Sequence, residues 1–348
     1  MATIDELLIN MVEIGGSDLH MMVGQPAKTR IHGDLVPTTE DHISESFMET
    51  MLKEICPEDK WKTFMERRDL DFAYEIPNVA RFRTNFLYNF YGIGAVFRQI
   101  PTKILTIKDL NLPEVLTKIS EYKSGLILVT GPTGSGKSTT MAAMIDHINE
   151  NYSKHIITIE DPIEFVHKNK KSTIVHMEIG VHANSFAEAM KSAMRSDPDI
   201  ILLGEMRDLE TIKLALTTAA MGVLVFGTLH TNNAPKTVDR IIDAFPADEQ
   251  PQVRMMLSES IQGIVSQLLC KKVGGKGRVA VHEILLWTEA LPNTIREGQI
   301  SNIRTIIENN TTNGMCSMDQ NLKKLVEEGT ITKEEGYMKA QDKKGFLG

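Results

Sequence analysis

Residues 126–145 read LILVTGPTGSGKSTTMAAMI, and this stretch decides the fold of the part of the chain around it. Residues 126–129 form a continuous apolar run typical of a buried strand, and residues 138–145 have helical periodicity. Between them, residues 131–138 match the P-loop pattern G-x-x-x-x-G-K-[ST] at every fixed position. Because a strand, a glycine-rich turn and a helix form the scaffold that this motif requires, the sequence predicts a nucleoside triphosphate site.

Each part of this loop has a chemical task. Glycines let backbone N–H groups close around phosphate oxygens, and the helix N-terminus adds its positive end. We expect Lys137 to reach the β- and γ-phosphates and the Ser138 hydroxyl to bind Mg²⁺. The predicted ATP-binding residues of the loop are Gly131, Thr133, Gly134, Ser135, Gly136, Lys137, Ser138 and Thr139.

The composition limits the class of protein. A length of 348 residues suggests two domains, and a formal net charge of −8 argues against a nucleic-acid motor, which usually has a basic face. The three cysteines form no C-x-x-C pair, so neither a zinc site nor a disulfide framework is indicated. The sequence shows no signal peptide and no apolar run of membrane-spanning length. We therefore expect a cytoplasmic protein without membrane insertion, which could still dock on a membrane complex.

Residues 1–98 predict an α+β domain built on an antiparallel sheet. Helical patterns cover residues 4–14, 44–55 and 57–67, and strand patterns cover residues 19–23, 28–32, 71–74, 82–86 and 96–100. Residues 99–112 contain Pro101 and have little periodicity, so we expect a linker there.

From residue 113 to residue 348, strands alternate with helices, which predicts an α/β domain with a largely parallel sheet. Ligands of such sheets bind at the carboxyl ends of the strands. From about residue 288 the pattern becomes helical and indicates a small subdomain. The predicted strands are 126–130, 155–160, 199–203, 223–228 and 279–286, and the predicted helices are 138–150, 185–195, 208–220, 236–243 and 248–269.

Acidic side chains follow two of these strands. Glu160 and Glu164 come after the strand at 155–160, where Pro162 turns the chain, and we expect both at the mouth of the sheet. A solvated acidic turn is the alternative. Glu205 ends the buried run 200–203 in the manner of a Walker B element, although Gly204 stands where a magnesium-binding Asp is often found.

Glu205 has two catalytic roles open to it: to organise the water shell of Mg²⁺ or to polarise the attacking water. Its alternative is a capping role for the helix at 208–220. Glu160 is the other predicted metal residue beside Ser138 and Glu205. His230 follows the apolar run 223–226 and is a candidate sensor of the γ-phosphate, although a lone histidine there is usually a structural residue.

The ATP transition state gathers negative charge on the γ-phosphoryl oxygens, so cations are needed around it. The P-loop domain supplies Lys137 and has no obvious finger arginine. Arg81, Arg83 and Arg98 of the N-terminal domain are the candidates, and alternation along the strand places Arg81 and Arg83 on one face. Pairing with surface carboxylates is the alternative for these arginines.

Taken together, these motifs resemble the type II/IV secretion ATPase family over nearly the whole chain. Residues 295–297 match only part of an A-I-R-x-x-I-R-E-like segment of pilus-retraction motors. The other matches are residues 16–20 to the N-terminal motif, 81–83 and 97–98 to the arginine-bearing strands, 159–164 to the Asp box, 204–208 to the Walker B segment, 228–234 to the His box and 314–320 to a further family stretch.

The resemblance implies a PAS-like N-terminal domain, a RecA-like ATPase domain and a homohexameric ring that binds ATP and Mg²⁺ between the two domains. Glu205, Glu164, His230 and Lys137 are then the catalytic residues, and the arginines close on the phosphates. Family members that extend pili usually carry a tetracysteine zinc site and a longer N-terminal region, and both are missing here.

The resemblance therefore implies a motor for type IV pilus retraction and twitching motility. Its partner would be the inner-membrane platform protein of the pilus machine, which places the motor peripherally at the pilus base. The alternatives are a pilus-extension or type II secretion ATPase, a hexameric nucleic-acid translocase, and a nucleotide switch without useful turnover.

Overall fold

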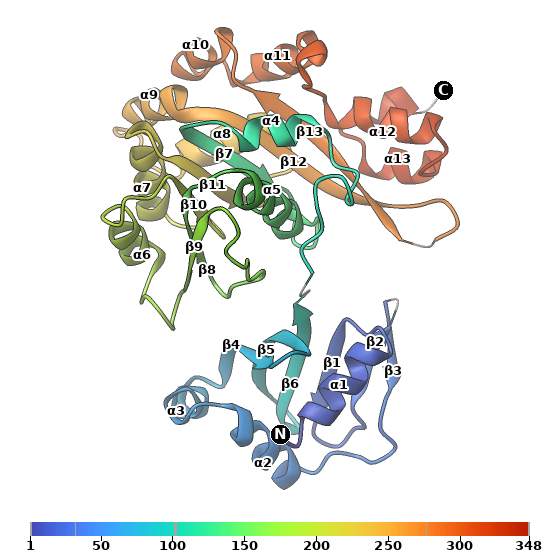
Figure 1. Cartoon of the computed structure of the whole chain (residues 1–348). Helices are drawn as coiled ribbons and strands as arrows, with labels where there is room; N and C mark the ends of the chain where they lie inside the picture. The colour runs from blue at the N-terminus through green and yellow to red at the C-terminus, as the bar shows by residue number, and fades with distance from the viewer. Residues whose placement is uncertain (1, 32, 101–102, 276, 347–348) are drawn as a thin grey trace. The chain divides into compact units, whose positions relative to one another are not determined.

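The computed structural model describes residues 2–31, 33–100, 103–275 and 277–346 of the chain. The chain divides into two compact units (Figure 1). The first comprises Met1–Lys103 with Glu164–Val166, and the second comprises Ile104–Ile163 with His167–Gly348. The division falls inside the segment 99–112 for which the sequence predicts a linker. Pro101 of that segment, and His32 of the predicted strand 28–32, lie outside the described residues.

The first unit contains a six-stranded sheet in the order β3-β2-β1-β6-β5-β4, and its described pairs are antiparallel. Its core joins the inward side chains of the strands, such as Leu19, Phe82 and Phe97, to those of the helices, such as Met48 and Phe64. The elements are α1 (Asp5–Glu13), β1 (Asp18–Met22), β2 (Lys28–Ile31), β3 (Asp34–Pro37), α2 (Glu45–Ile55), α3 (Glu58–Arg67), β4 (Asp69–Ile76), β5 (Ala80–Asn89) and β6 (Gly92–Ile100).

All three helices of the first unit cover one face of its sheet, because residues of each share the core cluster with alternate residues of β1, β5 and β6. Asp18, Arg83 and Arg98 point to the opposite face. The strand β3 carries no alternating pattern, since all four of its residues are exposed, and the sequence did not predict it.

The second unit contains a seven-stranded sheet in the order β13-β12-β7-β11-β10-β8-β9. Its pairs are parallel apart from the antiparallel pair of β12 and β13. The central strands are buried along their whole length, as parallel strands covered by helices on both faces are. The strands are β7 (Gly125–Thr130), β8 (His155–Glu160), β9 (Thr173–Glu178), β10 (Ile200–Leu203), β11 (Leu224–Leu229), β12 (Ile261–Lys271) and β13 (Arg278–Leu286).

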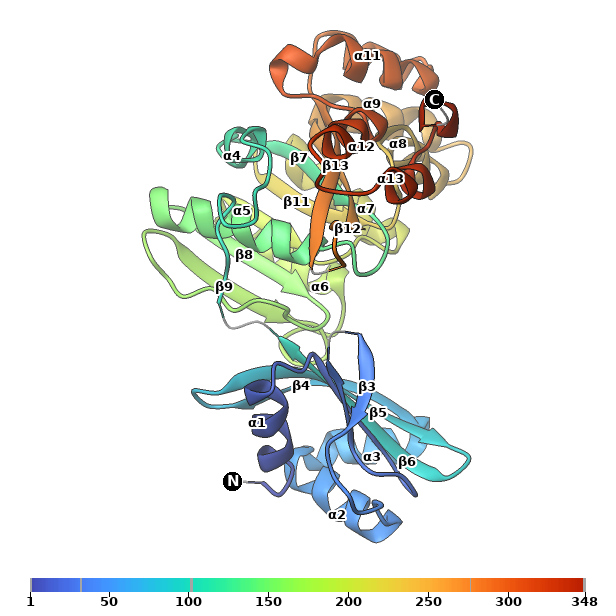
Figure 2. The same ribbon diagram turned by 90° about the vertical axis from the view of Figure 1, so that its right-hand side faces the viewer.

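The helices of this unit connect and cover those strands (Figures 1 and 2). None of the helices in the described part of the chain has the length and apolarity needed to cross a membrane. They are α4 (Val115–Ser120), α5 (Lys137–Asn151), α6 (Phe186–Ala193), α7 (Leu209–Ala220), α8 (Ala234–Asp243), α9 (Gln250–Ser260), α10 (Ala290–Arg296), α11 (Ile303–Asn309), α12 (Met318–Glu327) and α13 (Lys333–Lys339).

The structure corrects the helix predicted at residues 248–269. The helix α9 ends at Ser260, and the strand β12 begins at Ile261. Residues 261–271 read IQGIVSQLLCK, an apolar run that is buried on both sides, and such a run lacks the two-residue alternation that marks a half-exposed strand. The strand β9 was also not predicted.

Candidate active site

The P-loop connects β7 to α5, and the close approach of β12 explains its glycines. Gly131 has a φ of 145°, and a Cβ there would lie 2.2 Å from the backbone oxygen of Gln267 and 2.7 Å from the Oγ of Ser135. Gly136 has a φ of 87° and is the residue before α5, and a Cβ there would lie 2.9 Å from Nε2 of Gln267. Glycine is therefore required at both positions for steric as well as conformational reasons.

Lys137 is the first residue of α5, and its Nζ donates hydrogen bonds to the backbone oxygens of Gly131 at 2.9 Å and Pro132 at 3.2 Å. The lysine thus lies over the loop that it is predicted to serve. Ser138 and Thr139 are half-buried in the first turn of α5, and Thr133 and Gly134 are exposed at the tip of the loop.

Gln267 of β12 supports the P-loop from behind, and the sequence analysis did not find it. Its Nε2 donates to the backbone oxygen of Ser135 at 2.7 Å, and its Oε1 accepts from the Thr140 hydroxyl at 2.7 Å. The Nε2 of His282 on β13 lies 3.1 Å from the same oxygen. Burial lowers the pKa of His282 to about 4, so its neutral ring donates Nε2–H to Gln267.

The Gln267 side chain is buried, and each end of its amide has a partner of the right polarity. The P-loop backbone, the first turn of α5 and two further strands are therefore joined through one amide. The signal in the sequence was a polar pair, Ser266 and Gln267, inside an apolar run. The incorrect helix prediction for this run concealed that both lie beside the P-loop strand.

Glu205 and His230 lie together at the ends of β10 and β11, which are neighbouring parallel strands. The Nε2 of His230 lies 2.9 Å from Oε1 of Glu205, and Nη2 of Arg207 lies 2.7 Å from Oε2. Burial raises the pKa of Glu205, but the hydrogen bond and charge of Arg207 and the nearby His230 outweigh burial and lower it. The site therefore holds an ionised, oriented carboxylate.

Gly204 stands where a Walker B element often has an aspartate, and the strand β8 passes close to it. A Cβ at this position would lie 3.2 Å from the Cα of Glu160 and 3.3 Å from the backbone oxygen of Ile159. The alternative that Glu205 caps the next helix is wrong, since Asp208 is the cap of α7 and accepts from the backbone N–H of Thr211 at 2.8 Å.

Glu160 is half-buried at the last position of β8, next to the backbone of Gly204. The structure thus places Glu160 and Glu205 at the carboxyl edge of adjacent strands, β8 and β10. Glu164 is exposed and groups with the first unit. Its predicted role as a catalytic residue stays a prediction.

The candidate arginines lie on the helix-free face of the first unit's sheet. Arg83 and Arg98 are direct cross-strand partners, and Arg98 faces Asp18 on its other side. The Nε of Arg98 donates to Oδ1 of Asp18 at 2.7 Å, while Arg83 lies 3.6 Å from Asp71. Burial raises the pKa of Asp18, but hydrogen bonds from Ser17 and Arg98 outweigh it and lower the pKa.

Arg81 also contacts a carboxylate of its own unit, with 3.8 Å between its Nη1 and Oε2 of Glu75. Pairing with nearby carboxylates, the alternative for these residues, is therefore present at all three arginines. Their predicted role as phosphate clamps stays a prediction.

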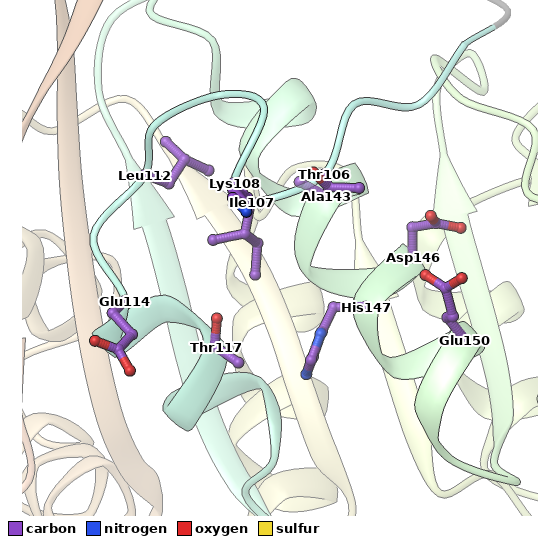
Figure 3. A pocket seen from close by; sticks show the side chains of 10 residues that line it. All are labelled: Thr106, Ile107, Lys108, Leu112, Glu114, Thr117, Ala143, Asp146, His147 and Glu150. Atoms are coloured by element: carbon purple, nitrogen blue, oxygen red, sulfur yellow. The ribbon is translucent and has the colours of Figure 1, made fainter.

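A cavity of about 410 Å³ lies beside α5, lined by the segment 106–117 and by Asp146, His147 and Glu150 of the helix (Figure 3). None of the predicted site residues lines it. Among the described residues, no group of three or more His, Cys, Asp or Glu side chains is placed to hold a metal ion.

Comparison with known proteins supports one family over nearly the whole chain. The family model described as type II/IV secretion system protein matches residues 2–338. The chain is 48% identical over 343 residues to the type IV pilus retraction ATPase PilT of Pseudomonas aeruginosa, covering 99% of each. It is 50% identical over 313 residues to a twitching motility protein of Neisseria gonorrhoeae, covering 90% of this chain and 84% of the relative.

Solved structures give the same likeness. The crystal structure of the pilus retraction motor PilT with bound ADP matches with a TM-score of 0.91 at 42% identity, covering 99% of this chain and 98% of that one. The ATPase DotB of Legionella pneumophila matches with a TM-score of 0.83 at 27% identity, covering 96% of this chain and 94% of that one.

Proposed function

Because the chain belongs to the type II/IV secretion system protein family, we propose that it is the ATP-hydrolysing motor that retracts type IV pili. The observation that carries the proposal is the joint presence of a complete P-loop and an oriented strand-end carboxylate in a chain that matches a retraction motor along its full length. ATP is the substrate, and hydrolysis supplies the work for pilus retraction and twitching motility.

The P-loop residues bind the phosphates. Backbone N–H groups of residues 133–138 would surround the β- and γ-phosphate oxygens, and Lys137 would contribute the cation. The donor set fits Mg²⁺, which prefers oxygen ligands and is usually held by one or two protein groups together with phosphates and water. Ser138 would hold the ion, with Glu160 and Glu205 near its water shell, and the ion would neutralise charge on the phosphates.

Glu205 orients the attacking water. Its carboxylate is held between Arg207 and His230, so its position is fixed before the substrate arrives. Glu164 is the second candidate for the general base. His230 senses the γ-phosphate, because its imidazole contacts the carboxylate that acts on the same phosphoryl group.

The first unit supplies the arginines in this proposal. Arg81, Arg83 and Arg98 lie on one sheet face that the helices leave uncovered, and they stabilise the transition state. The protein acts as a homohexamer. The partner of this homohexamer is the platform protein of the pilus machine at the inner membrane. Light scattering of the purified protein with nucleotide tests the assembly. A strictly monomeric protein with full ATPase activity would refute it.

Deletion of the gene tests the direction of the work. Loss of a retraction motor leaves cells that carry pili and do not twitch, and a phosphate-release assay on the purified protein measures the ATPase activity. Cells without any pili after the deletion would contradict retraction and favour an extension motor.

A further inference from the structure

Glu283 lies in the interior of the second unit, where it joins the first residues of two helices. This residue of β13 is 5% exposed. Its Oε1 accepts a hydrogen bond from the backbone N–H of Ala234 at 2.7 Å, and its Oε2 accepts from the backbone N–H of Met318 at 3.4 Å. Ala234 begins α8 and Met318 begins α12, so one carboxylate connects the two helices (Figure 2 shows α8, α12 and β13 in one part of the unit).

The α8 side of this connection includes the His230 segment, residues 230–233. Asn233 caps α8 by accepting from the backbone N–H of Lys236 at 2.9 Å. The hydroxyls of Thr231 and Thr237 lie 2.7 Å apart, and the Thr237 hydroxyl donates to the backbone oxygen of Asn233 at 2.7 Å. These bonds fasten the segment to the first turn of α8, so a displacement of His230 also displaces the start of that helix.

The α12 side is fastened in the same way. Cys316, two residues before α12, exchanges backbone hydrogen bonds with Ile284 of β13. Asp319 in the first turn of α12 accepts from the backbone N–H groups of Gln341 at 2.8 Å and Asp342 at 2.9 Å. The Nε2 of Gln341 lies 3.3 Å from Oε2 of Glu283. The start of α12 and the segment after α13 therefore meet at the same carboxylate.

Burial makes this connection stiff. A buried carboxylate is stable only with donors around it, and here two helix N-termini supply positive ends as well as N–H groups. If α8 moved away alone, it would leave Glu283 short of a donor in an apolar interior. The donors stay in place only if the end of β13 that carries Glu283, which is bonded to Cys316 before α12, moves together with α8 and α12, and this joint movement costs less free energy.

We propose that Glu283 is a positioning residue that couples the His230 segment to α12, so that a change at the γ-phosphate displaces the C-terminal helices. The inference rests on the proposed function, because it needs nucleotide to act on His230. It assigns the mechanical output of ATP turnover to a specific buried contact, which lies outside the P-loop and outside the strand-end carboxylates.

Hydrogen exchange of the full-length protein, with and without a non-hydrolysable ATP analogue and Mg²⁺, tests the coupling. In the wild type we expect the analogue to change the exchange of peptides covering residues 131–140, 228–238 and 316–327. In Glu283→Gln the acceptor that faces one helix becomes a donor. We then expect the response at 131–140 and 228–238 to persist and the response at 316–327 to fall at least about fivefold.

Ser317→Ala is the matched control. It removes the side-chain cap of α12 and leaves Glu283 intact. Residues 316–327 should therefore exchange faster than in the wild type both with and without the analogue, and the analogue should still change their exchange. If Glu283→Gln does not fold, Glu283→Asp keeps the charge but is one methylene too short to reach both helices, and the same loss is expected.

Two results would overturn the coupling: an undiminished response of α12 in the Glu283 variant, or no response of α12 in the wild type while residues 131–140 respond. A wild type without any response at 131–140 would instead refute nucleotide binding, and the proposed function would fall together with the inference.

Discussion

The Nε2 of His230 lies 2.9 Å from Oε1 of Glu205, and this contact joins the ends of two neighbouring parallel strands. The other oxygen of the carboxylate faces Arg207 at 2.7 Å. A cation and an imidazole thus hold the acidic residue on both sides, and its geometry is set by the sheet. Such preorganisation is what electrostatic stabilisation of a phosphoryl transition state requires.

Replacing Lys137 by alanine should abolish ATP hydrolysis and leave the fold intact. The side chain is half-buried in the loop, where its Nζ donates to two backbone oxygens, so we expect the free energy of unfolding to fall by about 1 kcal/mol. Phosphate release and a thermal melt of the same preparation measure both effects. Normal ATP turnover in a folded Lys137→Ala variant would contradict the assignment of the P-loop as the nucleotide site.

Glu205→Gln should retain ATP binding and lose turnover. The amide keeps the shape of the side chain but lacks the charge that orients water, and one of its ends presents N–H groups to Arg207 or His230. We expect kcat to fall about a hundredfold or more. Fluorescent-nucleotide binding separates affinity from chemistry. A loss of less than about tenfold would make Glu164 the main catalytic carboxylate.

Gln267→Met should weaken ATP binding, because it removes the amide and leaves Ser135, Thr140 and His282 without their buried partner. We expect KM for ATP to rise by about tenfold or more, and stability to fall by about 1–3 kcal/mol. The control is Gln262→Met, which makes the same change at the other end of β12, remote from the loop. Equal KM values in both variants would contradict the role of Gln267.

Arg98→Ala should destabilise the first unit in a pH-dependent way. Asp18 has a lowered pKa in the folded state, so its ionised form adds stability above the ordinary value of 3.8, and this contribution disappears as the pH falls through the lower folded value. Because Arg98 is largely exposed, we expect Arg98→Ala to lower the free energy of unfolding by about 1 kcal/mol at pH 7. This loss should become smaller as the pH falls below 3.8.

Urea unfolding of the full chain measures this cost, with Trp287 replaced by Phe so that Trp61 of the first unit is the reporter. Asp18→Asn should cost a similar amount, and the double variant should be less destabilised than the sum of the two. A cost of Arg98→Ala that is the same at neutral and acidic pH would rule out the pair as its cause.

Arg296→Ala and Glu297→Ala should keep most ATPase activity and abolish twitching. Both residues are exposed at the end of α10, where Glu297 accepts hydrogen bonds from Asn293 and Gln299, and neither contacts the P-loop. The comparison is ATP turnover in vitro against twitching in cells. Lys324→Ala, an exposed change on α12, is the control and should leave both unchanged. Intact twitching in both variants would show that the retraction interpretation is wrong.

The sequence predicted the P-loop and the strand-end residues because each lies within a short local pattern. The P-loop needs only one strand, one turn and one helix, and the positions of Glu205 and His230 follow from buried runs that end at a polar residue. Their mutual contact then follows from the parallel pairing of β10 and β11.

Gln267 and Glu283 could not be predicted in this way. Gln267 lies on β12 and contacts Ser135, which is more than a hundred positions away in the sequence. Glu283 lies on β13 and contacts the first residues of two separate helices, Ala234 and Met318. The run that contains Gln267 is buried on both sides, so its periodicity did not distinguish a strand from the helix that was predicted there. The roles of such residues depend on tertiary neighbours that no local pattern encodes.

The narrow space beside Gly204 also constrains how this sequence can change over evolutionary time. A Cβ at position 204 would lie 3.2 Å from the Cα of Glu160, a tight contact that requires the backbone of β8 to give slightly. A single codon change to the aspartate common in other P-loop proteins therefore disturbs the strand that carries Glu160. A carboxylate at position 204 would thus come only with a shift of β8, whereas Glu205 supplies a carboxylate at this edge of the sheet without that shift.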